Sequence, residues 1–77
     1  MGQTQSSKNL VYQPRKRLKL TQKQFAERLG VTFVSINRWE NDKSNPSKMA
    51  KKLLMGVLIE MGDRGSDLLE QYFAKTL

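Results

Sequence analysis

The chain of 77 residues is 38% hydrophobic, carries a formal net charge of +7 and contains neither cysteine nor histidine. This length predicts one small domain with a single core and no second folded unit. The missing residue types exclude disulfides and thiolate metal sites and remove the commonest nucleophiles and general bases. No glycine-rich phosphate loop, GxSxG motif or paired-carboxylate motif compensates for them. We therefore expect no catalytic residue, no metal site and no cofactor.

The first nine residues are small and polar and lack apolar periodicity, so we predict a flexible arm over 1–9 and a folded domain over 10–77. Leu10 and Val11 can line one side of a first helix. Pro14 has no backbone N–H, and its ring clashes with the preceding helical turn. The first helix is therefore expected either to start near Pro14 or to kink there.

A dense basic run follows this proline. It is either a solvated face or a surface that binds phosphate, and we favour phosphate contact for Lys16, Arg17 and Lys19. The wider charge distribution agrees, because residues 1–52 hold 12 Lys/Arg against 3 Asp/Glu, whereas residues 53–77 hold 2 against 4. The first two thirds of the chain thus have the charge that attracts a polyanion.

A second helix is predicted directly after the basic run. Thr21 and Gln24 form a capping-box pattern at its start, and Gly30 can adopt the left-handed conformation that ends a helix. Thr32 then offers an N-cap for a third helix that begins one residue later. With so short a link the two helices must cross steeply, as in a helix-turn-helix unit.

The third helix has two different faces. A helical wheel centred on Ile36 places Trp39 on the buried side and Val34 and Arg38 on the exposed side, with Asn37 at the flank. The exposed side thus offers an apolar group, an amide and a guanidinium. These groups can read a thymine methyl, an adenine edge and a guanine edge in a DNA major groove.

The run LTQKQFAERLGVTFVSINRWENDKSNPS resembles the Cro and repressor (XRE) family of helix-turn-helix DNA-binding domains. The matching positions are Gln22, Ala26, Gly30, Ile36 and the sequence Trp39-Glu40-Asn41. The likeness extends over roughly residues 15–58. It implies an all-α, compact bundle of about five helices, a lambda-repressor-like domain that docks its third helix in the major groove, usually as a dimer.

The resemblance also assigns residue roles by position. Its base-reading positions are Thr32, Phe33, Val34, Asn37 and Arg38, and its phosphate-contacting positions are Gln22, Lys23, Asn41 and Lys43. Arg15 is expected to form a structural ion pair with Glu40, which the wheel places near the buried margin, where a carboxylate needs a partner. Two positions depart from the family pattern, since Asp42 replaces a common glycine and Phe33 a common polar side chain.

Two further helices are predicted beyond the turn formers of residues 41–46. Asn45 followed by Pro46 suggests the N-cap and first position of a fourth helix that runs to about Met61. Ser66 is the expected cap of a fifth helix. The apolar residues of this last helix exceed what so small a core needs, so they either cover the core or form a two-fold dimer interface.

The leading hypothesis is a non-enzymatic, sequence-specific binder of double-stranded DNA that acts as a transcriptional repressor or other regulator. An alternative is an antitoxin-like or adaptor protein whose acidic, aromatic C-terminal helix binds a protein partner while the helix-turn-helix binds DNA. In a third interpretation, the domain supplies DNA affinity to a larger assembly. We expect a cytoplasmic protein, because no apolar run reaches the length of a membrane span and no signal-peptide core is present.

Overall fold

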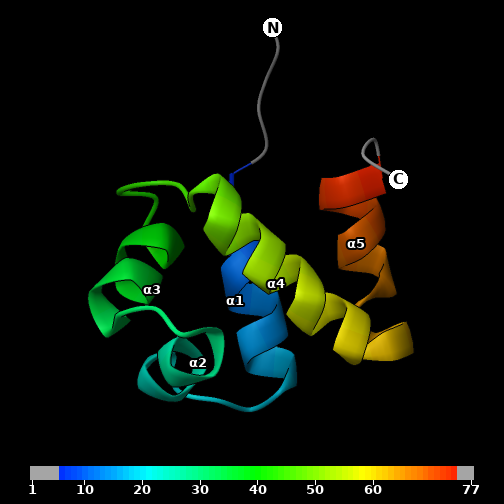
Figure 1. The fold of residues 1–77 in the computed structure, drawn as a ribbon, viewed down its shortest axis with the longest axis horizontal. Helices are drawn as coiled ribbons and strands as arrows, with labels where there is room; N and C mark the ends of the chain where they lie inside the picture. The colour runs from blue at the N-terminus through cyan, green and yellow to red at the C-terminus, as the bar shows by residue number, and fades with distance from the viewer. Residues whose placement is uncertain (1–5, 75–77) are drawn as a thin grey trace, which may run out of the picture.

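The computed structural model describes residues 6–74 of the chain, and within this range all regular structure is helical. The all-α bundle predicted from the sequence is confirmed (Figure 1). In chain order the elements are α1 (Lys8–Arg17), α2 (Gln22–Leu29), α3 (Phe33–Glu40), α4 (Lys48–Glu60), the short 3-10 helix η1 (Gly62–Arg64) and α5 (Ser66–Phe73).

Helix α1 does not start at its proline. It begins at Lys8 and carries Pro14 inside it, so the predicted start near Pro14 is wrong. The reason is packing: Leu10 and Val11 are fully buried, and the proline ring itself lies in the core. Burying two such side chains gains roughly 1.5–3 kcal/mol each, which offsets a cost of about 3 kcal/mol for an interior proline.

The start of α1 also shortens the predicted N-terminal arm. Ser7 is buried, and Lys8 and Asn9 belong to the helix, so the folded part begins earlier than the predicted boundary between residues 9 and 10. Residues 1–5, on which the rest of that prediction falls, lie outside the described residues.

Helix α2 has the predicted start and end. The backbone N–H of Gln24 donates to Thr21 Oγ1 at 3.0 Å, and the N–H of Thr21 donates to Gln24 Oε1 at 2.9 Å, which completes the capping box. Gly30 ends the helix with a φ of 79°, a conformation that a residue with a Cβ rarely adopts. The next N-cap, Thr32, accepts a hydrogen bond from the Ser35 N–H at 3.1 Å and starts α3 as predicted.

The predicted caps of the last two helices need correction. The N-cap of α4 is Ser47, whose Oγ accepts from the Ala50 N–H at 3.1 Å, while Pro46 is buried ahead of the helix. Ser66 is the first residue of α5 and not its cap, because its hydroxyl donates to the Asp63 carbonyl of the preceding turn at 3.2 Å. Residues with cap chemistry occur close together here, and only the folded path of the backbone selects between them.

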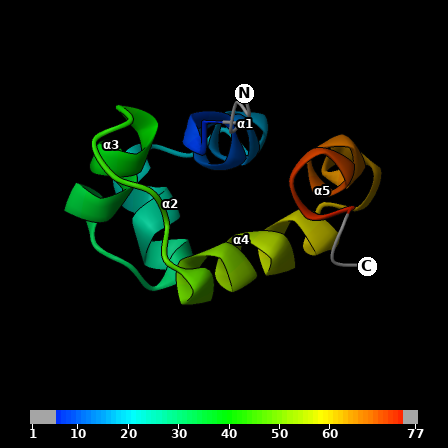
Figure 2. The same ribbon diagram turned by 90° about the horizontal axis from the view of Figure 1, so that it is seen from above.

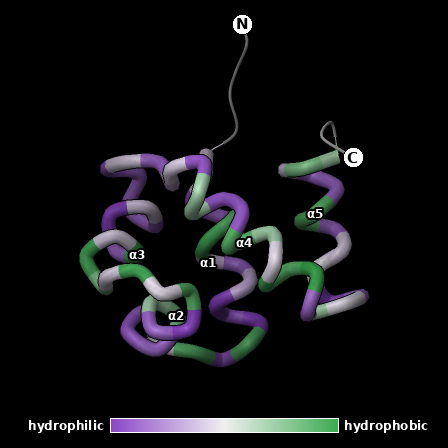
Figure 3. Tube along the Cα trace, viewed as in Figure 1, coloured by the Kyte–Doolittle hydropathy of each residue, from purple (hydrophilic) through white to green (hydrophobic). Residues whose placement is uncertain are grey.

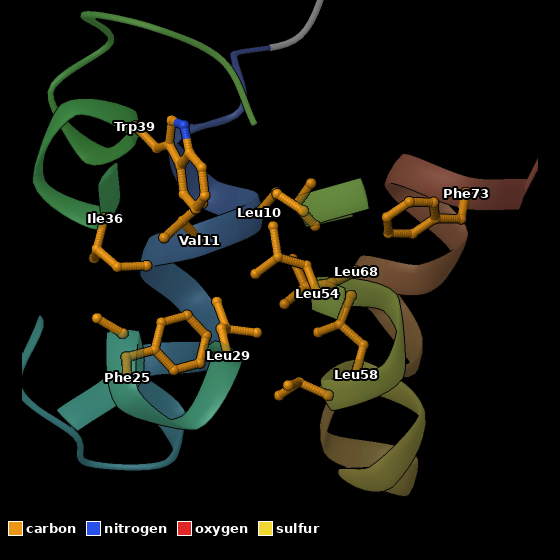
Figure 4. Close-up of a cluster of buried hydrophobic side chains, with 13 residues drawn as sticks. Leu10, Val11, Phe25, Leu29, Ile36, Trp39, Leu54, Leu58, Leu68 and Phe73 are labelled. Atoms are coloured by element: carbon orange, nitrogen blue, oxygen red, sulfur yellow. The ribbon is translucent and has the colours of Figure 1, made fainter. Parts of the chain in front are cut away.

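One hydrophobic core connects the helix-turn-helix to the rest of the bundle. Helix α1 packs against α3 on one side and against α4 on the other, and α4 also contacts α2 and α5 (Figures 1 and 2). Phe25, Ile36, Leu54 and Leu58 are fully buried around α1, and Phe73 closes the far end (Figure 4). Hydrophobic and hydrophilic residues alternate along the helices (Figure 3), as expected for elements that each bury one face.

Candidate nucleic-acid interface

The face of α3 that points away from the core has the composition that the wheel predicted. Ile36 and Trp39 are buried, whereas Phe33 is 49% exposed, Val34 is 60% exposed and Arg38 is exposed. The bundle therefore holds α3 firmly on one side and presents the other side to solvent. Such a helix can enter a groove about 12 Å wide without disturbing the core.

Arg15 and Glu40 form the expected ion pair beneath this face. Arg15 Nε donates to Glu40 Oε2 at 2.7 Å and Nη2 donates to Oε1 at 2.9 Å, while Nη1 donates to the Leu20 carbonyl at 3.0 Å. The two side chains are only 12% and 6% exposed. The hydrogen bonds to Glu40 raise the pKa of Arg15 against the opposite effect of burial. The pair ties α1 to the end of α3.

Gln22 extends this ion pair to the exposed edge of α3. Its Nε2 donates to Glu40 Oε1 at 3.0 Å, and its Oε1 accepts from Asn37 Nδ2 at 3.1 Å. Asn41 Nδ2 in turn donates to the Asn37 carbonyl at 2.8 Å and to Asn37 Oδ1 at 3.3 Å. The amide of Asn37 is thus oriented by hydrogen bonds from both sides. The predicted role of Gln22 is contact with phosphate. This bridge is not visible in the sequence, because its hydrogen bonds join two different helices.

Most of the predicted phosphate-contacting side chains are exposed near the two ends of the helix-turn-helix. Lys19 and Lys23 lie on either side of the N-cap of α2, and Asn41 and Lys43 follow α3. The Nζ of Lys16 lies over the ring of Tyr12 at 5.9 Å from its centroid. The structure leaves all five side chains accessible from solvent.

The turn after α3 contains one of the two departures from the family pattern. Asp42 has a φ of 57°, which suits the glycine common at this position. Its Oδ1 accepts a hydrogen bond from Ser6 Oγ at 2.6 Å. The carboxylate that would oppose a phosphate is therefore engaged with the N-terminal end of the described chain.

Comparison with protein-family models identifies the family to which this arrangement of helices belongs. The model described as helix-turn-helix matches residues 12–54, which is more than half of the chain. The chain belongs to the Cro/C1-type helix-turn-helix family. This is a family of DNA-binding transcription regulators. Searches of curated proteins and of solved structures found no match.

Arg17, one of the side chains predicted to contact phosphate, forms an ion pair within this helix-turn-helix domain. Arg17 Nη1 donates to Asp67 Oδ1 at 2.7 Å and Nη2 donates to Oδ2 at 3.0 Å, and Nη1 also reaches the Arg64 carbonyl at 2.6 Å. Arg64 donates back to the carbonyl of Arg17. Arg17 therefore fastens α1 to the start of α5, and this ion pair competes with the phosphate contact predicted for it. Because its partners lie about fifty residues away, the sequence could not identify them.

The Arg17–Asp67 pair should make the stability of the helix-turn-helix domain sensitive to acid. Hydrogen bonding to Arg17 lowers the pKa of Asp67 below its ordinary value. A carboxylate with a lowered pKa stabilises the fold above its ordinary pKa, and this contribution disappears as the pH falls through the folded-state value. We expect Asp67→Asn to be less stable than the parent at about pH 7, and the difference should shrink as the pH falls below about 4 towards the folded-state pKa, so that it is smaller at about pH 3.

Urea unfolding of both proteins at the two pH values measures this difference. Asp63→Asn, at an exposed aspartate of η1 outside the pair, is the matched control. A stability difference for Asp67→Asn that is equally large in acid would contradict the ionic origin of the effect.

Helix α5 uses its aromatic side chains within the fold. Phe73 is 6% exposed in the core, and the half-buried Tyr72 donates its hydroxyl to the Ser6 carbonyl at 3.1 Å. Burial raises the pKa of Tyr72. Of the two uses predicted for the apolar residues of this helix, covering the core accounts for Leu68 and Phe73. Leu77 lies outside the described residues. Within residues 6–74, no helix has the length and apolar character needed to cross a bilayer.

Proposed function

We propose that this helix-turn-helix domain is a transcriptional repressor that recognises its operator by inserting α3 into the major groove. The observation that carries the proposal is the exposed face of α3, where Val34 and Arg38 point away from the core and Asn37 is fixed at the edge. A guanidinium can bind guanine O6 and N7, an amide can bind adenine N6 and N7, and an apolar group can contact a thymine methyl. Thr32 and Phe33, at the start of α3, complete the proposed base-reading set.

The surroundings of α3 supply the sequence-independent part of the binding. Gln22 and Lys23 lie in the first turn of α2, where backbone N–H groups and the helix dipole favour an anion. Asn41 and Lys43 lie beyond the other end of the recognition helix, and Lys16 and Lys19 extend the basic surface. Phosphate contacts on both sides of a groove set the register of a protein on its duplex, while contacts to the bases set its sequence preference.

A bound domain of this kind represses by occupying DNA that another protein needs, which requires no catalytic group. The proposed mechanism therefore rests on affinity and specificity. Because lysine and arginine displace condensed cations from DNA, the affinity should fall steeply with salt concentration.

Two alanine variants separate the two kinds of contact. Arg38→Ala should weaken binding to the preferred site by about 1–3 kcal/mol and relax specificity at one base pair, because only one base loses its partner. Lys43→Ala should weaken binding to all sequences alike and reduce the salt dependence by about one counterion. Arg38 Nη2 donates a weak, exposed hydrogen bond to the Lys43 carbonyl at 3.4 Å. Truncation of Arg38 therefore leaves that carbonyl in contact with solvent and should not destabilise the fold.

Selection from a random duplex library, followed by titration of the selected site in several salt concentrations, tests both expectations. The parent protein should enrich one motif, and Lys43→Ala should enrich the same motif with lower affinity. An unchanged motif for Arg38→Ala would remove Arg38 from the base-reading set. Absence of any enriched motif with the parent protein would refute sequence-specific binding.

A further inference from the structure

Helix α4 leaves one apolar face uncovered. Met49 is 71% exposed, Ile59 is 60% exposed and Leu53 is 40% exposed, and Gly56 lies among them. At 100° per residue these positions share one side of the helix, opposite the buried Leu54. Helices α1 and α5 pack on the other side (Figure 2), while α2 borders this face along one edge, where Arg28 pairs with Glu60.

Among the described residues, neither a positive φ nor a close contact requires the glycine at position 56, at the centre of this face. It is exposed in the middle of a regular helix, and a Cβ built on it would meet no atom within 4 Å. Glycine at such a position costs about 1 kcal/mol relative to alanine. A glycine on a helix surface does, however, allow the backbone of another helix to approach closely.

The residues on either side of Gly56 form equally spaced pairs, one of opposite charge and one apolar. Lys52 stands four residues before the glycine and Glu60 four residues after it, while Leu53 and Ile59 stand three residues before and after. A second α4 running antiparallel across Gly56 would place Lys52 of each copy opposite Glu60 of the other. The same arrangement places Leu53 of one copy and Ile59 of the other at the same level along the paired helices. Within one chain Lys52 and Glu60 are about 12 Å apart along the helix and do not pair.

We propose that a second copy of this chain packs on α4, with the two helices antiparallel and the two-fold axis at Gly56. An isologous interface requires one surface to be complementary to itself, which the order of charged and apolar residues about Gly56 provides. This dimer uses α4 and not α5, whose Leu68 and Phe73 are already buried in the monomer. The proposal does not depend on DNA binding.

The groove between α2 and α4 fits this arrangement. It encloses about 280 Å³ and is lined by Arg28, Leu53, Gly56 and Glu60 among others. The side chain of Ile59 from the second copy would face Leu53 at its edge. Glu60 Oε1 accepts from Arg28 Nη2 at 2.8 Å, and Oε2 can receive the lysine of the second copy.

Sedimentation of the full chain over a range of concentrations, without DNA, tests the interface through a charge exchange. The parent should dimerise, and Lys52→Glu and Glu60→Lys should each weaken the dimer by about tenfold or more, because two symmetric attractions become repulsions. The double variant Lys52→Glu/Glu60→Lys should restore association. Since Lys52 and Glu60 do not pair with each other within one chain, recovery of association indicates contact between copies.

A second variant separates dimerisation from folding. Gly56→Gln should raise the thermal stability of the monomer, since glutamine is a better helix former and has open space around it, yet it should abolish the dimer by blocking the close approach. Glu70→Lys, on the exposed part of α5, is the matched charge control and should leave the dimer intact. A parent that stays monomeric at the highest concentrations, or a dimer that survives Gly56→Gln and both single charge reversals, would overturn the proposal.

Discussion

Replacing Glu40 with alanine should lower the free energy of unfolding by about 3–5 kcal/mol. The carboxylate is 6% exposed and accepts hydrogen bonds from Arg15 Nε and Nη2 and from Gln22 Nε2. Its removal leaves a guanidinium that is only 12% exposed without its counter-charge, and it releases the amide that orients Asn37. For a small domain this is a large fraction of the total stability.

Urea unfolding followed by circular dichroism measures the loss. Glu27→Ala, at an exposed glutamate of α2, is the control and should change stability by less than about 0.5 kcal/mol. The double variant Arg15→Met/Glu40→Leu should recover much of the loss, because two apolar side chains of similar size avoid a buried unpaired charge. A loss below about 1 kcal/mol for Glu40→Ala would mean that solvent reaches and stabilises Arg15 in the variant.

Replacing Gly65 with alanine should destabilise the domain by about 2–3 kcal/mol. A Cβ at this position would lie 2.5 Å from the Leu58 carbonyl oxygen and 3.1 Å from two further backbone atoms of Leu58. The obstacle is the backbone of α4, which cannot rotate away as a side chain can. The substitution must therefore push the start of α5 away from α4 and loosen the packing of Leu68.

The same substitution at Gly56 is the matched control, because a Cβ there meets nothing within 4 Å. Gly56→Ala should stabilise the monomer by up to about 1 kcal/mol, opposite in sign to Gly65→Ala. Thermal unfolding at low protein concentration compares the two. Equal and small effects of both substitutions would show that α5 moves freely relative to α4.

The first three helices illustrate how far local rules reach. Thr21, Gln24, Gly30 and Thr32 fix the ends of α2 and the start of α3 through contacts no more than four residues apart, so their pattern is visible in the sequence. The wheel of α3 also succeeds, since the burial of Ile36 follows from helical periodicity. Pro14 shows the limit, because its local cost is outweighed by burial that depends on distant helices.

The candidate site divides in the same way. Residues that face outward from α3, such as Val34 and Arg38, could be named from the wheel and the family pattern. The partners of Arg17 and the bridge made by Gln22 could not, because each hydrogen bond joins elements that only folding brings together. A cation in a sequence shows that a charge is present but not whether a neighbour in space already neutralises it.

By itself, the sequence determined the helical class, the position of the helix-turn-helix and the outward face of α3. These features depend on caps and periodicity, which act over one or two helical turns. Only the tertiary structure decided that Arg17 binds Asp67, that Gly65 must lack a side chain and that one face of α4 is uncovered. These features depend on the distance between helices, which is set by the packing of the whole core.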